Sequence, residues 1–135
     1  MAVPIIKLRG MSNQLEAQLK SRGIFNSDQL LDAARTPAGR KALAEYAAVE
    51  TRVILELANR SDLARVKGIG GVFSDLLEHA GVDTVKELAT RRSDNLYAKL
   101  IEINAQQKLT GRAPTQNAVE SWVAQAKTLP AVLEY

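Results

Sequence analysis

Apolar residues recur along most of the chain at the three- and four-residue spacing of helices that bury one face. Leu15 and Leu19 lie one helical turn apart, as do Leu96 and Leu100 in a later segment. The apolar stripe of the last segment consists of Val119, Trp122, Val123 and Ala126. No segment alternates apolar and polar residues long enough, with a period of two, to indicate a strand. The pattern therefore predicts an all-α protein.

Helix starts are marked by residues whose side chains accept a hydrogen bond from an N–H group of the first turn. Thr36 precedes a proline at the first helical position, where the missing N–H group costs nothing. Thr84 and Glu87 have the spacing of a capping box. Ser61 predicts a further start, with a helix across SDLARV (61–66). The other expected starts are Ser12 or Asn13, Asn26 or Ser27, Ser93, and Thr115.

The order of these elements repeats within the chain. Residues 8–31 align on residues 66–89 without a gap, at a shift of 58 positions. Conservative pairs such as Leu15 and Phe73 lie between the identities. The identical pairs fall where tight turns and a helical core face need them, at Gly10/Gly68, Leu19/Leu77, Gly23/Gly81 and Leu30/Leu88.

The later part of each unit repeats at a longer shift. Residues 49–63 align on residues 115–129, and the additional residues of the second unit fall around QQKLTGRA (106–113), a polar loop that contains glycine. We therefore expect two copies of one helical unit, residues 1–63 and 64–135, packed together as one compact domain.

Composition is that of an ordinary globular protein, with 46% hydrophobic and 24% charged residues among 135. The absence of cysteine excludes disulfides and thiolate metal ligands. Neither a signal peptide nor a bilayer-spanning segment stands out, so we expect a cytoplasmic protein without a membrane partner. The net charge is +3, but residues 1–67 carry 11 Lys/Arg against 7 Asp/Glu, whereas residues 68–135 carry 7 against 8. Attraction to nucleic acid should therefore favour the first half.

The stretch VKGIGGVFSDLLEHAG (66–81) contains the most informative local pattern. Gly68 and Gly70 flank Ile69 between two helical patterns, and glycine allows backbone angles that let two helices cross over a very short loop. The loop opens directly into a helix N-terminus, whose unpaired N–H groups and dipole attract an anion. The stretch lacks the strand and third glycine of a dinucleotide fingerprint, and the Gly-Lys-Ser/Thr of a P-loop. It indicates either a purely structural turn or a turn that contacts a phosphate.

The chain resembles the helix-hairpin-helix superfamily, and more closely a bacterial family of unknown function with two such hairpins. The resemblance is carried by LARVKGIGGVFSDLLEHAGVDTVKELATR (63–91), SDNLYAKLIEIN (93–104) and VESWVAQAKTLPAVLEY (119–135). It implies an all-α, SAM-domain-like fold built as a tandem helix-hairpin-helix repeat. It also implies DNA binding through the hairpin backbone without sequence readout. Some members of the superfamily hold a monovalent cation on loop carbonyls, which here would lie at Gly68–Gly70; no other cofactor is expected.

Carried over residue by residue, the resemblance implies phosphate contacts in both hairpins. In the second hairpin the amides are those of Gly68, Gly70, Gly71 and Val72, with charge from Lys67 and Arg65. In the first hairpin the matching positions are Gly10, Ser12, Asn13 and Gln14, with charge from Lys7 and Arg9. The chain departs from the superfamily in two ways: DNA-binding hairpins carry a basic residue after the second glycine, and Ser12 replaces that glycine in the first hairpin.

The sequence leaves two function classes open. The first is a non-enzymatic module that binds the backbone of DNA or RNA with weak to moderate affinity and without sequence readout. The second is a protein-interaction module with structural hairpins, which the missing basic residues after the glycines favour. An enzyme is not expected, because the only histidine, His79, has no oriented partner and is expected on the surface, and no carboxylate pair stands out.

Overall fold

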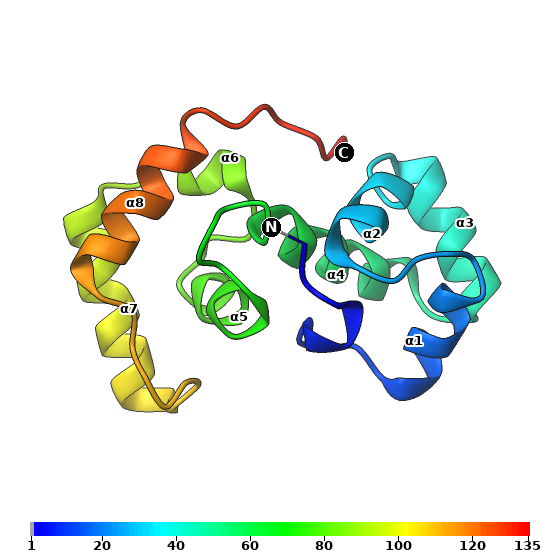
Figure 1. The fold of residues 1–135 in the computed structure, drawn as a ribbon, viewed down its shortest axis with the longest axis horizontal. Helices are drawn as coiled ribbons and strands as arrows, with labels where there is room; N and C mark the ends of the chain where they lie inside the picture. The colour runs from blue at the N-terminus through cyan, green and yellow to red at the C-terminus, as the bar shows by residue number, and fades with distance from the viewer. Residues whose placement is uncertain (1) are drawn as a thin grey trace.

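The structure is a computed structural model that describes residues 2–135, and its regular elements are helices (Figure 1). Apart from one isolated bridge between Pro4 and Asn26, these residues form no strand, and none of their helices is long and apolar enough to cross a bilayer. The predicted all-α fold is confirmed. The elements are η1 (Ile5–Lys7, a 3₁₀ turn), α1 (Asn13–Lys20), α2 (Ser27–Ala33), α3 (Pro37–Ala47), α4 (Thr51–Leu63), α5 (Gly71–His79), α6 (Val85–Leu88), α7 (Ser93–Gln107) and α8 (Gln116–Ala126).

Five predicted helix starts are capped as expected, by a side-chain oxygen that accepts a hydrogen bond from the N–H group three residues later. These caps are Ser12, Asn26, Thr36, Thr84 and Thr115. The capping box is only half formed, because the Glu87 carboxylate pairs with Arg91. The helix start predicted at Ser61 is wrong. Ser61 lies inside α4, where its hydroxyl donates to the Leu57 carbonyl at 2.8 Å and the buried face continues to Leu63.

Apolar side chains gather into two clusters that share α4. The first cluster draws on η1 and α1 to α3, and on Ile54, Leu57 and Ala58 of α4. The second draws on Leu63 at the end of α4 and on α5 to α8, and it includes Trp122, whose exposed fraction is 2%. Figure 1 shows α1 to α3 on one side of α4 and α5 to α8 on the other. The helix α4 therefore belongs to both halves of the molecule.

The segment after α8 returns to the first half of the molecule (Figure 1). The carbonyl of Pro130 accepts a hydrogen bond from Arg65 at 2.6 Å. Further along, the N–H group of Glu134 donates to the Arg35 carbonyl at 2.8 Å, and the buried Arg40 donates to the Glu134 carbonyl at 2.7 Å. These bonds tie the segment after α8 to the end of α4, to the loop before α3 and to α3 itself.

The loops before α1 and α5 have the same backbone geometry. Four glycines adopt the left-handed region of backbone angles, and they are the four that the internal alignment pairs: Gly10, Gly23, Gly68 and Gly81. One backbone hydrogen bond closes each loop, from Met11 N–H to the Leu8 carbonyl and from Ile69 N–H to the Val66 carbonyl. Each loop therefore leads its chain directly into the first turn of a helix.

Candidate nucleic-acid interface

The predicted phosphate-contacting amides of the second hairpin lie mainly at the start of α5. Gly70 is the N-cap, Gly71 is the first helical residue, and no side chain caps this turn. Among the residues that the structure describes, the N–H groups of Gly70, Gly71 and Val72 have no protein acceptor. Unpaired N–H groups at a helix N-terminus, together with the helix dipole, attract anionic groups. The start of α5 therefore has the donors that a phosphate requires.

Gly71 is the point at which the two hairpins touch. A Cβ atom built on Gly71 would lie 1.8 Å from the carbonyl oxygen of Lys7 and 2.7 Å from its carbonyl carbon. Only glycine fits this contact, and Gly71 is buried by it. The side chain of any other residue at position 71, a basic one included, would overlap the Lys7 backbone. The contact brings the backbone of the first hairpin, with Lys7 and its neighbours, to the first turn of α5.

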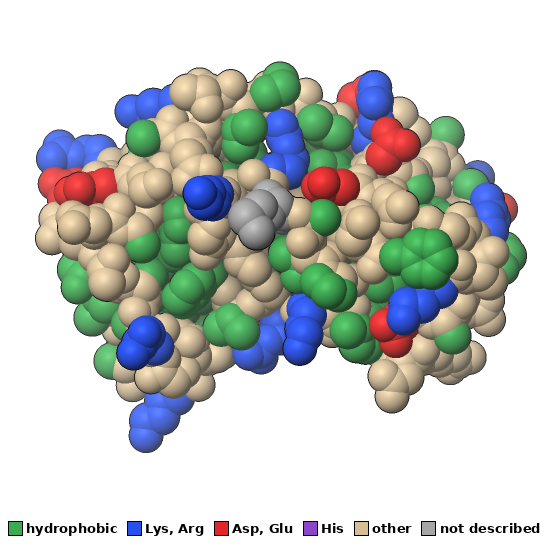
Figure 2. Space-filling view, in the orientation of Figure 1, with side chains coloured by type: hydrophobic (Ala, Val, Ile, Leu, Met, Phe, Trp, Pro, Cys, Tyr) green, Lys and Arg blue, Asp and Glu red, His purple; other side chains and the backbone are tan. Residues whose placement is uncertain are grey.

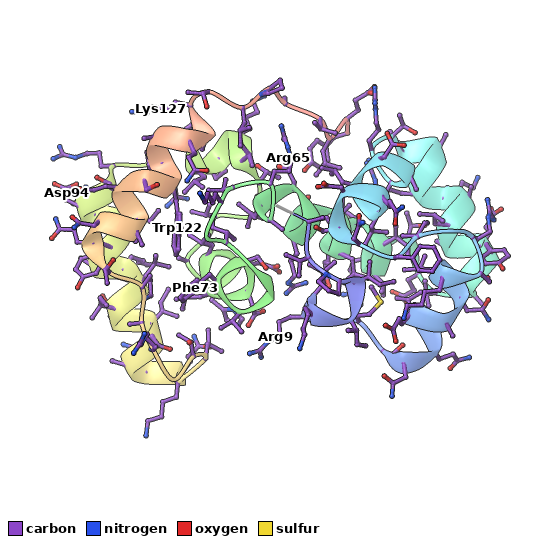
Figure 3. The ribbon with its side chains drawn as sticks, viewed as in Figure 1. Arg9, Arg65, Phe73, Asp94, Trp122 and Lys127 are labelled. Atoms are coloured by element: carbon purple, nitrogen blue, oxygen red, sulfur yellow. The ribbon has the colours of Figure 1, made fainter. Side chains whose placement is uncertain are left out.

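The basic residues of the first hairpin are exposed and have no carboxylate partner among the described residues. Within residues 2–135 no carboxylate lies within 4.0 Å of the charged groups of Lys7 or Arg9. Arg9 extends toward the second half of the molecule, where its Nη2 atom lies 3.5 Å from the Leu109 carbonyl oxygen. Figure 3 shows Arg9 beneath α5. These two cations are therefore available to an external anion close to the α5 amides.

Arg65 is placed differently. Its Nη1 atom lies 2.7 Å from the Asp62 carboxylate and its Nη2 atom donates to the Pro130 carbonyl, which leaves the side chain 12% exposed. Figure 3 shows Arg65 beneath the segment that follows α8, away from Arg9. The guanidinium of Arg65 therefore fastens the segment after α8, and it does not join the other predicted site residues.

Two residues of α8 hold the loop of the second hairpin. A Cβ atom on Gly68 would lie 3.0 Å from Trp122 Nε1. The Trp122 ring also packs against Phe73, with 5.3 Å between the ring centroids (Figure 3). The side-chain amide of Gln125 bonds both backbone groups of Lys67, accepting from its N–H at 2.9 Å and donating to its carbonyl at 3.2 Å. Lys67 is exposed, and its backbone is fixed to α8 by these two hydrogen bonds.

The helix that follows the first hairpin loop has a side-chain N-cap, whereas the helix that follows the second has none. Ser12 stands at the position of the second glycine, and its Oγ atom accepts from Leu15 N–H at 3.0 Å. Gly10 is exposed, and a Cβ atom there would have no neighbour closer than 3.8 Å. The N–H groups of Asn13 and Gln14 follow the cap on the exposed side of α1. The serine therefore supplies the cap that Gly70 lacks.

A buried ionic cluster joins α4 to α5 behind these loops. Arg60 Nη2 lies 3.2 Å from Asp75 Oδ1 and 2.9 Å from Glu78 Oε2, and its side chain is 10% exposed. Burial raises the pKa of Glu78 above its ordinary value, against the opposing effect of the Arg60 charge. His79 is exposed, and its Nδ1 atom contacts the Asp75 backbone carbonyl at 2.8 Å. The cluster therefore fastens α5 to α4. Residues 2–135 contain no group of three or more His, Asp or Glu side chains that could hold a metal ion.

Sequence reasoning missed Arg60 and Gln125. Arg60 lies three residues after Leu57 and three before Leu63, on the buried face of α4, and a charged residue at such a position signals a buried ion pair. Gln125 carries no comparable signal, because a polar residue on an amphipathic helix is ordinarily solvated.

The family described as Domain of unknown function (DUF4332) matches residues 9–129, which include α1 to α8 and the whole loop of the second hairpin. The chain belongs to the DUF4332 family. The expected likeness to a family of unknown function is thereby confirmed. No curated protein and no solved structure matches the chain. The DUF4332 match ends before the segment that returns to α3, and it begins at Arg9, inside the first hairpin.

Proposed function

We propose that this DUF4332 protein is a non-enzymatic module that binds the backbone of nucleic acid without reading the bases, through two tandem helix-hairpin-helix units. The observation that carries the proposal is the contact between the Lys7 carbonyl and Gly71. Because of this contact, the segment that carries Lys7 and Arg9 lies against the first turn of α5, where the N–H groups have no protein acceptor. A phosphate needs both kinds of group, since N–H donors orient it and cations neutralise it.

The mechanism requires no catalytic residue. Phosphate oxygens of one strand accept hydrogen bonds from the N–H groups of Gly70 and Val72, while Lys7 and Arg9 displace counterions from the neighbouring phosphates. These contacts carry no base information, so affinity should vary little with sequence. Two cations give a shallow salt dependence, of about −0.9 in log K against log salt for each neutralised phosphate.

Fluorescence anisotropy of a labelled DNA duplex, titrated at low and at moderate salt, tests this function. We expect micromolar or weaker binding at low salt that weakens with rising salt, equally for two duplexes of unrelated sequence. Labelled RNA and single-stranded DNA form parallel arms of the same titration. Absence of binding to all of these at low salt would contradict the proposed function.

A second candidate is docking of a protein partner, favoured by apolar side chains on both sides of the same contact. Ile6 is 38% exposed and Val72 is 40% exposed, and each is the chain neighbour of a residue at the junction of the hairpins. Substitution of Ile6 and Val72 by serine distinguishes the two candidates. The double variant should keep nucleic-acid affinity if the backbone amides bind phosphate, and should lose a nuclease-resistant protein partner if the apolar surface docks one.

A further inference from the structure

The loop between α7 and α8 is ordered by its own hydrogen bonds. The side-chain amide of Asn104 accepts from Thr110 N–H at 3.0 Å and donates to the Thr110 carbonyl at 3.2 Å. The Thr110 hydroxyl donates to the Arg112 carbonyl at 3.0 Å, and Leu109 packs against the second apolar cluster. Lys108 and Arg112 are exposed on this loop. The loop therefore holds two cationic residues on a backbone that is fixed before any ligand arrives.

The same loop lies beside the first hairpin. Arg9 Nη2 reaches the Leu109 carbonyl at 3.5 Å, which joins the two segments across the junction of the halves. Residues 1–15 contain two basic residues and no acidic one, and the same is true of residues 103–119. In the described part of the chain no carboxylate lies within 4.0 Å of Lys108 or Arg112. Figure 2 shows basic side chains along the lower edge of this face, from the end of α7 to beneath α5.

We propose that this loop is a separate binding element for nucleic-acid phosphates, which extends the hairpin surface into one track of four cations, Lys7, Arg9, Lys108 and Arg112. The inference rests on the proposed function and goes beyond the hairpins, because the loop has no counterpart in the first unit of the internal alignment. A pre-ordered loop loses little conformational freedom on binding, so its charges contribute most of their attraction. Phosphates at the loop belong to nucleotides further along the same backbone than those at α5.

The test compares two double variants of equal charge. Lys108→Gln with Arg112→Gln neutralises the loop. Lys86→Gln with Lys99→Gln neutralises two exposed lysines elsewhere in the second half, which have no carboxylate within 4.0 Å in the described part of the chain. Duplex affinity is measured by anisotropy over a salt series, with circular dichroism confirming helicity. We expect the loop variant to lose about 10- to 100-fold in affinity at 0.1 M salt, and its log–log salt slope to become shallower by about two. The control should change by less than about twofold.

The outcomes separate this inference from the function on which it rests. If the wild-type chain binds and the loop variant matches the lysine control, the loop contributes nothing specific and the inference is wrong, while the hairpin function stands. If the wild-type chain binds no nucleic acid at low salt, both are wrong. A third variant, Lys108→Arg with Arg112→Lys, keeps both positive charges of the loop. It should keep the wild-type dependence of affinity on salt, and a loss of that dependence would show that charge is not what the loop supplies.

Discussion

The two hairpins differ in how many of their residues are held by contacts with the rest of the protein. The second hairpin has both glycines of the motif, but its loop is fastened by Trp122 and Gln125, and its Arg65 is paired with Asp62. The first hairpin has lost a glycine to Ser12, yet it keeps Lys7 and Arg9 unpaired and exposed.

The hairpin with the complete glycine motif is thus not the one with more basic side chains free to contact a ligand. Gly68 has a positive φ and lies against the Trp122 ring, and Gly71 accommodates the Lys7 carbonyl, so backbone conformation and packing explain why both are glycine. Among the described residues, two of the three exposed loop cations without a carboxylate partner, Lys7 and Arg9, lie on the hairpin with the weaker motif, and only Lys67 lies on the other. Donors from α5 and cations from the first hairpin would then form one composite surface, which neither hairpin forms alone.

The largest expected effect comes from breaking the ionic joint behind the loops. Arg60→Ala leaves the buried Asp75 carboxylate and the half-buried Glu78 carboxylate without their cation, so we expect a loss of about 3 kcal/mol in the free energy of unfolding. Urea denaturation measures it. The matched control is Arg52→Ala, which removes an exposed pair with Glu50 and should cost less than about 1 kcal/mol. Equal costs for the two variants would show that Arg60 does not join the halves.

A smaller loss is expected from Gly71→Ala. The added methyl group would overlap the Lys7 backbone, which cannot move aside as a flexible side chain could, and overpacking of this kind costs about 1–3 kcal/mol. Hydrogen exchange should report faster opening of α1 and α5 together. The control Gly111→Ala adds its methyl group to open space. A Gly71→Ala protein as stable as the control would refute direct contact between the hairpins.

The two loop glycines provide the finest comparison. Both have positive φ, so an alanine at either position should cost about 1–2 kcal/mol from the backbone alone. At Gly68 the methyl group also meets the Trp122 indole at 3.0 Å, whereas at Gly10 the nearest atoms lie at 3.8 Å. We therefore expect a lower unfolding temperature for Gly68→Ala than for Gly10→Ala. Tryptophan fluorescence should change for Gly68→Ala only. The reverse ranking would mean that Trp122 does not hold the loop.

Most of the helical architecture is predictable from the sequence, because caps and apolar stripes are local signals. Ser12 and Thr115 begin their helices as expected, and Trp122 is buried as its stripe indicates. The start predicted at Ser61 fails because a serine hydroxyl also satisfies itself inside a helix, on the carbonyl one turn back.

The arrangement of the candidate site is less predictable. The sequence identifies the glycines and the basic residues, but the contact of Lys7 with Gly71 joins residues from different halves of the chain. The pairing of Arg65 with the Pro130 carbonyl depends on where the segment after α8 returns. Both are tertiary contacts without a local pattern, and they decide which charges remain available.

The central claim is that the first hairpin supplies the charge for nucleic-acid binding. Arg9→Gln and Lys67→Gln test it most directly, because each removes from one hairpin an exposed cation that has no carboxylate partner within residues 2–135. Duplex affinity is measured over a salt series for both variants. We predict that Arg9→Gln makes the log–log salt slope shallower by about one, and that Lys67→Gln leaves it nearly unchanged. An equal or larger change for Lys67→Gln would contradict the account.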